Sequence, residues 1–496
     1  MSPGNVRASL HPLLCGPYTR LMSGDPHVVT QEGFLADGTA TLEWVARYLE
    51  EIRSYPVAPS VAPGDIVASL PMHAPEEPES FATILGDLDR VVLPGITHWQ
   101  APGFFAYFPA SSSPPAILAE LVSAGLAVNG MLWATSPACT ELEMVVLDWL
   151  VDLLGLPEHF RSAGPGGGVI QDSASSATLC ALIAARERTL VAGATLDRLT
   201  LYATSEAHSS MQKGAKVAGF RPAQLRKVPV SSDFSMDPSA LSDMIGEDHA
   251  AGLVPCFVLA TSGTTSSMAF DPLQPVGEIC GREGVWLHVD AAMAGSAAIC
   301  PELRGFQDGL ELADSYAFNP HKWLLTNFDC DCFYVRERSA LTGALSVTPA
   351  YLGNAASTSG SVIDYRDWQI PLGRRFRALK LWFVLRSYGA EGLRRHLRNH
   401  VALTARLREH LEADERFGFV APPALNLLCF AHVGGNSVTE RLMRDVNDTK
   451  RVLLSHTVLG GRYTIRCSIG GTWTEERDVD ELWKLIDEIA PPVPGS

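Results

Sequence analysis

Several familiar signatures are missing from this 496-residue sequence. Neither G-x-x-x-x-G-K-[S/T] nor a G-x-G-x-x-G that follows a strand occurs, so binding of nucleoside triphosphates or dinucleotides loses its main support. A G-x-S-x-G elbow is also absent, which argues against an α/β-hydrolase. The ten cysteines show neither paired zinc-ligand spacing nor a dense disulfide framework, so we predict no metal site and a reducing compartment.

Positive charge is scarce: 39 Lys and Arg stand against 55 Asp and Glu, a formal net charge of -16. Nucleic acids and anionic membranes require a basic surface, so neither is expected as a partner. The most apolar window, residues 116–134, is interrupted by Glu120 and Asn129 and favours a core helix over a membrane span. No basic segment leading into an apolar run opens the chain, and we therefore expect a cytosolic protein.

Hydrophobic periodicity divides the chain into three parts after an aperiodic stretch, residues 1–32, which we interpret as a flexible extension. Amphipathic helices at about 37–52 and 80–91 have no core of their own and should pack on another surface. Helical segments then alternate with predicted strands at 199–204, 256–261, 285–289, 315–318 and 332–335. This alternation predicts an α/β fold with a mostly parallel sheet.

The last part, from about residue 368 to 490, is amphipathic and helical, most clearly over 393–411. Strands predicted at 427–431 and 463–467 make it a small α+β domain.

A lysine follows the predicted strand at 315–318. The strand ends at Asn319-Pro320, which breaks regular pairing and presents Lys322 just beyond the strand's carboxyl end. Flanked by His321 and Trp323, the amine would be partly desolvated, which lowers its pKa and leaves a nucleophile able to form an imine with an aldehyde. Pyridoxal 5'-phosphate (PLP) is held in this way. A snorkelling surface lysine is the alternative for Lys322 taken alone.

An acid at the end of the preceding strand favours the cofactor. Asp290 ends the apolar run 284–289 and is followed by small residues. PLP chemistry requires a carboxylate against the pyridine nitrogen, because the protonated ring accepts electrons from the substrate Cα. A helix cap or turn is the alternative for Asp290 taken alone. The two features together, a strand that ends in Asp290 and a following strand that leads through a turn to Lys322, are a stronger signal for PLP than either one alone.

Three further stretches carry candidate ligand contacts. Glycines 166–168, read as a close turn, lead through hydroxyl residues into an Ala/Leu-rich helix after Thr178, whose first N–H groups would suit a phosphate. His208 follows a predicted strand and could stack on a cofactor ring. The turn at 260–265 offers hydroxyls, including Thr265, and the aromatic cluster at 104–109 fits core packing and a ring-lined pocket equally well.

The chain resembles the group II PLP-dependent amino-acid decarboxylases, most closely those that act on aromatic L-amino acids. The resemblance runs from about residue 32 to 491. Its motifs are Pro94 to Trp99, Tyr107 to Pro109, Ser136 to Glu143, His288 to Ala292, Asn319 to Trp323 and Trp368 to Arg375.

The resemblance implies a fold-type I homodimer with PLP as cofactor and an aromatic amino acid as substrate. It implies a helical dimerisation segment at 33–113, a large PLP-binding domain at 114–379 and a small C-terminal domain at 380–490. Catalytic roles fall on Lys322, Asp290, His208 and Tyr351. The cofactor contacts would be Ala174, Ser175, Thr265, Asp290, Asn319, His321 and Lys322. The substrate contacts would be Trp99, Tyr107, Phe108, Ala110, His208 and Gly373.

Two positions bear on the reaction and the substrate. In relatives, a tyrosine at the position of Tyr351 is thought to return a proton to Cα and give an amine, whereas phenylalanine accompanies oxidative deamination to an aldehyde. A phenol can donate that proton and a phenyl ring cannot, so decarboxylation is favoured over an aldehyde synthase. Gly373, where some relatives carry serine, leaves room for a bulky ring such as indole or catechol.

Two departures from the family pattern narrow the prediction. Ala110 stands where relatives often have a hydroxyl, which weakens the case for dihydroxyphenylalanine. Asp172 puts an acid near the proposed phosphate site, so we expect its side chain to face away. A PLP-fold protein that binds an amino acid without turning it over is the alternative from another functional class.

Overall fold

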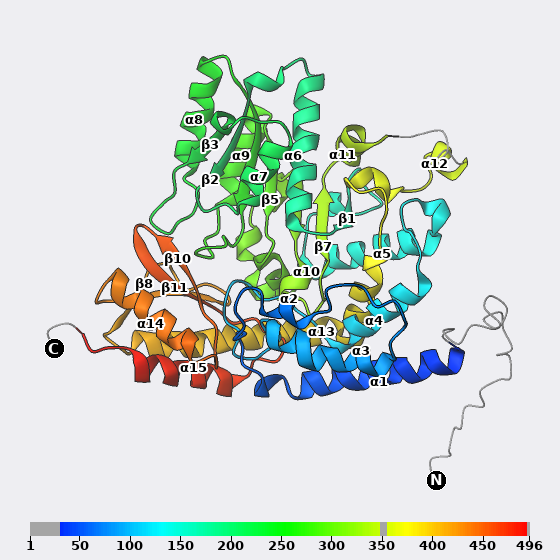
Figure 1. Ribbon diagram of the computed structural model, residues 1–496. Coiled ribbons are helices and arrows are strands. Elements are labelled where there is room, and N and C mark those ends of the chain that lie inside the picture. The colour runs from blue at the N-terminus through cyan, green and yellow to red at the C-terminus, as the bar shows by residue number, and fades with distance from the viewer. Residues whose placement is uncertain (1–29, 348–354, 494–496) are drawn as a thin grey trace, which may run out of the picture. The chain divides into compact units, whose positions relative to one another are not determined.

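The computed structural model describes residues 30–347 and 355–493 (Figure 1). It divides into two compact units between His98 and Trp99. The helices of the first unit are α1 (Gln31–Glu50), α2 (Asp65–Ser69) and α3 (Phe81–Asp87). Helix α1 begins six residues before the predicted start at residue 37, because the Thr30 hydroxyl caps it by accepting a hydrogen bond from the Gly33 N–H at 3.0 Å. None of the described side chains of α1 is buried.

The second unit is built on a mixed sheet in the order β1-β7-β6-β5-β4-β2-β3. Its strands are β1 (Gly167–Gln171), β2 (Leu199–Thr204), β3 (Leu225–Val228), β4 (Val254–Thr261), β5 (Trp286–Asp290), β6 (Ser315–Phe318) and β7 (Asp331–Val335). Strands β3, β2, β4, β5 and β6 pair in parallel, whereas β7 is antiparallel to both β6 and β1. The predicted α/β fold with a mostly parallel sheet is confirmed.

Helices connect most of these strands, as Figure 1 shows for α6, α8 and α9. The connecting helices are α6 (Ala174–Val191), α7 (Ser210–Val217), α8 (Pro238–Ala250), α9 (Leu273–Glu283) and α10 (Pro320–Trp323). Helices α4 (Pro114–Leu126) and α5 (Pro137–Leu154) precede β1, and α11 (Arg338–Leu345) and α12 (Ala355–Ser359) follow β7. Among the described helices, none is both long and apolar enough to cross a membrane.

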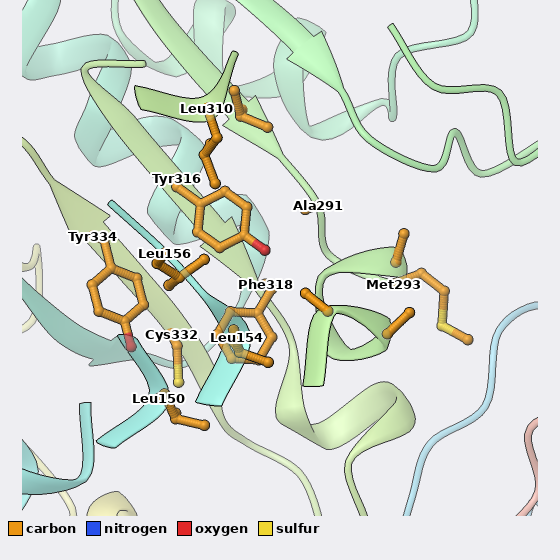
Figure 2. Close-up of a cluster of buried hydrophobic side chains, with 14 of the residues drawn as sticks. Leu150, Leu154, Leu156, Ala291, Met293, Leu310, Tyr316, Phe318, Cys332 and Tyr334 are labelled. Atoms are coloured by element: carbon orange, nitrogen blue, oxygen red, sulfur yellow. The ribbon is translucent and has the colours of Figure 1, made fainter. Parts of the chain in front are cut away.

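Alternation along the strands gives the sheet two different faces. Tyr316 and Phe318 of β6 and Cys332 and Tyr334 of β7 point to one face, where they pack among leucines of the segment 150–156 (Figure 2). The residues between them, including Ala317 and Phe333, pack on the opposite face with α6. Both faces are covered, which explains why these strands read as continuous apolar runs.

The small C-terminal domain contains an antiparallel sheet in the order β10-β11-β9-β8. Its elements are α13 (Arg377–Glu412), β8 (Phe417–Phe419), β9 (Leu427–His432), α14 (Asn436–Asp448), β10 (Ser455–Leu459), β11 (Arg462–Ser468) and α15 (Glu476–Ile489). The predicted strands at 427–431 and 463–467 match β9 and β11. The predicted helix at 393–411 is the second half of α13, whose path is interrupted by Gly389 in a non-helical conformation.

Three local predictions were wrong. Strands β1, β3, β8 and β10 were missed, because they are short or lack clear alternation. Glycines 167 and 168 belong to strand β1 rather than to a turn: a Cβ on Gly168 would lie 2.7 Å from the Tyr334 ring, so close packing requires the glycine. Helix α4 ends at Leu126 instead of continuing to residue 134, and its Leu121 is 52% exposed, unlike a core helix.

Candidate active site

Lys322 stands where the sequence placed it, just after the carboxyl end of β6. Asn319 occupies the N-cap and Pro320 the first position of the one-turn helix α10, and the Lys322 N–H donates to the Asn319 carbonyl at 3.0 Å. Pro320 suits this position because the first N–H of a helix has no partner within it. The short turn therefore aims the lysine away from the strand.

A second segment holds the lysine backbone in place. The Ser111 N–H donates to the His321 carbonyl at 2.7 Å and the Ser111 hydroxyl to the Lys322 carbonyl, also at 2.7 Å. The buried Ser113 hydroxyl donates to the Leu325 carbonyl at 2.6 Å. Sequence reasoning missed both serines, because nothing local marks them as partners of a loop more than 200 residues away.

Asp290 ends β5 and lies next to the lysine strand. It pairs in register with Thr261 of β4 and Ala317 of β6, and its carboxylate accepts a hydrogen bond from the Ala292 N–H at 3.0 Å. The residue is 5% exposed. The parallel strands thus bring a carboxylate and an amine to the same edge of the sheet, as expected where such sheets bind ligands.

The start of α6 lies at the same edge. The Ser173 side chain caps the helix by accepting from the Ser176 N–H at 3.3 Å, and the first turn contains no acidic residue. Ala174 and Ser175 therefore present N–H groups and the positive end of the helix dipole, a combination suited to a phosphate. Asp172 accepts a hydrogen bond from the Ser173 hydroxyl at 3.2 Å and is not among the residues that line the cavity.

Two histidines flank the lysine, and both are held by backbone N–H groups. The His208 Nδ1 accepts from the Ser210 N–H at 3.2 Å, and the His321 Nδ1 accepts from the Cys330 N–H at 3.0 Å. In their neutral forms both rings carry the proton on Nε2. Burial lowers the pKa of His208, and burial together with the Lys322 charge lowers the pKa of His321 to about 3.

These groups surround one cavity of about 210 Å³ within the second unit. It is lined by Phe108, Ser173, Ala174, Ser175, His208, Thr261, Gly263, Thr265, Asp290, Ala292, Met293, Asn319, His321, Lys322 and Phe328. All seven residues predicted to contact PLP are on its wall. Sequence reasoning did not single out Phe328, whose ring stacks on His321 with centroids 4.0 Å apart.

The cavity chemistry fits PLP. It offers an amine for the aldehyde, a carboxylate for the pyridine nitrogen and a helix N-terminus for the phosphate. Within the described residues, the Thr261 hydroxyl oxygen and the Asn319 Oδ1 are buried without a hydrogen-bond partner. Burial lowers the pKa of the Lys322 amine, a shift opposed by the negative charge of Asp290 and supported by Arg466. A lysine with a lowered pKa is a better nucleophile at neutral pH.

The predicted substrate residues are less closely gathered. Phe108 and His208 line the cavity, but Trp99, Tyr107, Ala110 and Gly373 do not. Trp99 and Tyr107 stack on each other with ring centroids 5.7 Å apart, and Tyr107 is 58% exposed. Tyr351 lies outside the described residues.

The Phe108 ring lies near two basic side chains, Lys322 and Arg466. The Lys322 Nζ is 5.4 Å from the centroid of its ring and the Arg466 Cζ is 5.2 Å from it. Arg466, from β11 of the small domain, is buried and donates to the Tyr107 carbonyl at 3.3 Å and the Ser455 hydroxyl at 3.0 Å. Sequence reasoning missed this arginine, since its strand carries no catalytic motif.

Comparison with known proteins agrees with this chemistry. The model of the pyridoxal-dependent decarboxylase conserved domain matches residues 63–433. The chain is 46% identical to a phenylacetaldehyde synthase of Arabidopsis thaliana, covering 91% of this chain and 95% of that protein. It is also 46% identical to the aromatic-L-amino-acid decarboxylase of Bos taurus, covering 93% and 96%.

A solved structure gives the same result for the fold. The crystal structure of Oryza sativa TDC with PLP and tryptamine superposes with a TM-score of 0.92 at 39% identity, covering 94% of this chain and 99% of that one. Together with the lysine, the carboxylate and the helix N-terminus at one sheet edge, these matches show that the chain is a PLP-dependent enzyme and belongs to the pyridoxal-dependent decarboxylase family.

Proposed function

We propose that this enzyme decarboxylates aromatic L-amino acids to arylalkylamines and CO2. The observation that carries the proposal is the single cavity where Lys322, Asp290 and the N-terminus of α6 meet, with the Phe108 ring on its wall. Relatives at 46% identity include a protein named for aromatic amino acids, which supports an aromatic substrate.

Each polar group has a distinct role in this proposal. PLP, when bound, supplies the electron sink for cleavage of the bond between Cα and the carboxylate. Lys322 would supply the amine that holds the cofactor, and Asp290 would keep the proton on the pyridine nitrogen. His208 would stack on the cofactor ring. Ala174, Ser175, Asn319 and His321 would hold the phosphate end, and Thr265 would also contact the cofactor. Tyr351 returns a proton to Cα after CO2 leaves.

The substrate pocket in this proposal is made of aromatic rings. Phe108 contacts the substrate side chain within the cavity, and Trp99, Tyr107, Ala110 and Gly373 complete the pocket when the enzyme is assembled. The exposure of Trp99 (38%), Tyr107 (58%) and Phe328 (57%) supports a homodimer in which a second copy covers this face. Sedimentation velocity should give a dimer mass, and a monomer with full activity would contradict this part of the proposal.

Product analysis tests the reaction directly. The PLP-loaded protein receives equimolar Trp, Phe, Tyr, dihydroxyphenylalanine and His under air, and mass spectrometry identifies the products, with Lys322→Ala as the inactive control. We expect amines from one or more of the first four, with tryptamine abundant if Gly373 sets the pocket size. No amine from any of these four, from protein that binds PLP, would refute the proposal.

The 46% identity to a phenylacetaldehyde synthase makes oxidative deamination the second candidate. Aldehyde, peroxide and ammonia formed with O2 consumption would support it, and an oxygen electrode distinguishes the two reactions. In our proposal Tyr351 directs the outcome, so Tyr351→Phe should shift the product from amine towards aldehyde. A variant that still makes only amine would remove that role from Tyr351.

A cytosolic location is also part of the proposal. The nine cysteines among the described residues are free thiols, as a reducing compartment favours. Fractionation of the source cells, with antibody detection, tests the location.

A further inference from the structure

Asp331 is a buried acid beside the active site that the proposed reaction does not use. It is the first residue of β7 and stands opposite Gln171 of β1. On its other side Cys332 pairs with Phe318 of β6, so the next antiparallel position places Asn319 opposite Asp331. Side chains at directly opposite positions have Cβ atoms about 5 Å apart.

The side chains of Asp331 and Asn319 lie on the face of the sheet that α6 covers. Phe318 and Cys332 point to the other face, as Figure 2 shows, and neighbouring residues along a strand alternate. Asp290 shares the α6 face, because its neighbour Val289 packs with the opposite core. Asp331 therefore shares one face of the sheet with Gln171, Asn319 and Asp290, and the last two of these, Asn319 and Asp290, line the cavity.

No donor satisfies the Asp331 carboxyl group among the described residues. Both oxygens are buried without a hydrogen-bond partner, and the residue is 0% exposed. Gln171, on one side, directs its amide hydrogens to the Trp368 carbonyl at 2.8 Å and to the Cys180 Sγ at 3.7 Å. A carboxylate in such a place would be strongly disfavoured.

The surrounding charges also favour the protonated form of Asp331. Burial and the negative charge of Asp290 raise the pKa of Asp331 well above its ordinary value, and Asp172 adds to this. Lys322 opposes the shift without reversing it. A carboxyl group under these conditions keeps its proton and acts as a donor as well as an acceptor.

Asn319 lies on the other side of Asp331 from Gln171. Its side-chain oxygen lacks a hydrogen-bond donor, which a protonated Asp331 would provide. Its Oδ1 is buried without a partner, although the same residue lines the cavity. An amide oxygen can only accept, so this atom requires an N–H or O–H group. If the Oδ1 faces the interior, the NH2 group is the half of the amide that faces the cavity.

We propose that Asp331 is a neutral carboxylic acid whose proton bonds to the Asn319 Oδ1 and thereby fixes the Asn319 NH2 towards the cofactor phosphate. One hydrogen bond satisfies two groups that otherwise have no partner. Asp331 is thus a positioning residue, and its neutrality keeps a second negative charge away from a phosphate site. The inference rests on the role of Asn319 in the proposed function.

Infrared spectroscopy of the enzyme in its resting state tests the protonation directly. At neutral pH, the difference spectrum between wild type and Asp331→Asn should contain the C=O band of a protonated carboxyl group. The matched control is Asp248→Asn, because Asp248 is also buried but accepts hydrogen bonds from Tyr202 and Arg226, which lower its pKa. That control should not change the protonated-carboxyl band. A wild-type spectrum without an Asp331 band would overturn the proposal.

PLP titration followed by absorbance tests the hydrogen bond. The side chain of the Asp331→Asn variant can still donate to Asn319, so the PLP dissociation constant of this variant should stay within about twofold of wild type. Asp331→Leu should weaken PLP binding about tenfold, the effect of one lost hydrogen bond. Asp331→Ala serves the same purpose if leucine prevents folding. Equal effects of asparagine and the apolar residues would reject the bond.

The infrared result is independent of turnover. A protonated-carboxyl band from Asp331 with no amine product would refute the proposed reaction and leave this inference intact. Normal amine production without the band would support the proposed reaction and refute this inference.

Discussion

The buried ion pair between Glu143 and Arg374 allows a quantitative test of how the large domain holds the segment that carries Gly373. The two side chains are 0% and 1% exposed, with the Arg374 Nη2 2.7 Å from the Glu143 Oε1. The same carboxylate oxygen accepts from the Ile170 N–H at 2.7 Å, and Arg374 also donates to the Gln369 Oε1 at 3.0 Å. The pair therefore ties α5, β1 and residues 369–374 together.

Removing one partner of the ion pair should lower the free energy of unfolding by several kcal/mol. Glu143→Leu leaves a buried guanidinium without its counter-charge, which destabilises a protein by about 3–5 kcal/mol. With an m-value of about 3 kcal/mol/M, the urea midpoint should fall by about 1 M or more. Arg374→Met should also lower the midpoint, because the buried Glu143 carboxylate still accepts from the Ile170 N–H but loses its counter-charge.

The double variant provides the decisive measurement. Replacing both charges with apolar groups of similar size is often neutral or stabilising, so Glu143→Leu/Arg374→Met should be more stable than Glu143→Leu alone. Urea unfolding monitored by circular dichroism gives the four midpoints of the cycle, with Arg477→Ala on the surface as a control that should not shift the midpoint. If the two losses simply add, the pair is not coupled and the reasoning fails.

Four further predictions follow from the site. Lys322→Ala should abolish the visible absorbance of the PLP-loaded protein and amine formation; a retained band would mean that another amine holds the cofactor. Asp290→Asn should reduce kcat by about 100-fold or more while the protein still binds PLP, because a preorganised charge is lost; near-normal steady-state kinetics would exclude its role at the pyridine nitrogen. Ser111→Ala removes the 2.7 Å hydrogen bond to the Lys322 carbonyl and should cost about 1 kcal/mol of stability, measured by urea unfolding, with a lower kcat; an unchanged midpoint would show that the segment is held otherwise. Burial raises the pKa of Asp271 to about 7, so only the unfolded state ionises from about pH 4 upwards, and wild type should lose stability relative to Asp271→Asn as the pH rises from about 4 to 7; parallel melting temperatures across this range would contradict the shift.

Part of the site could be predicted because its signals are local. Each of Asp290, Asn319 and Lys322 stands within four residues of the end of a strand with a clear apolar pattern. The carboxyl ends of parallel strands meet at one edge, so the sequence order alone predicts that these groups converge. The seven predicted cofactor contacts do line one cavity, although their roles remain proposals.

Other parts of the site depend on contacts that no local pattern encodes. Ser111 donates to the carbonyl of Lys322 in α10, 211 residues later in the chain, and Arg466 comes from the small domain to lie over Phe108. The glycines of β1 were taken for a turn because glycine commonly forms one, whereas here the closeness of the Tyr334 ring requires glycine at position 168.

The fold class, and the lysine and carboxylate at the ends of neighbouring strands, can be inferred from the order of residues along the chain, because strand periodicity and short-range order control these features. The groups that surround this lysine and carboxylate depend on how distant segments pack. Strand β7 inserts antiparallel between β6 and β1, and this insertion puts Asp331 opposite Asn319 and away from water. The protonation state of an acid depends on such neighbours and on burial, which arise only when segments distant in the chain pack together.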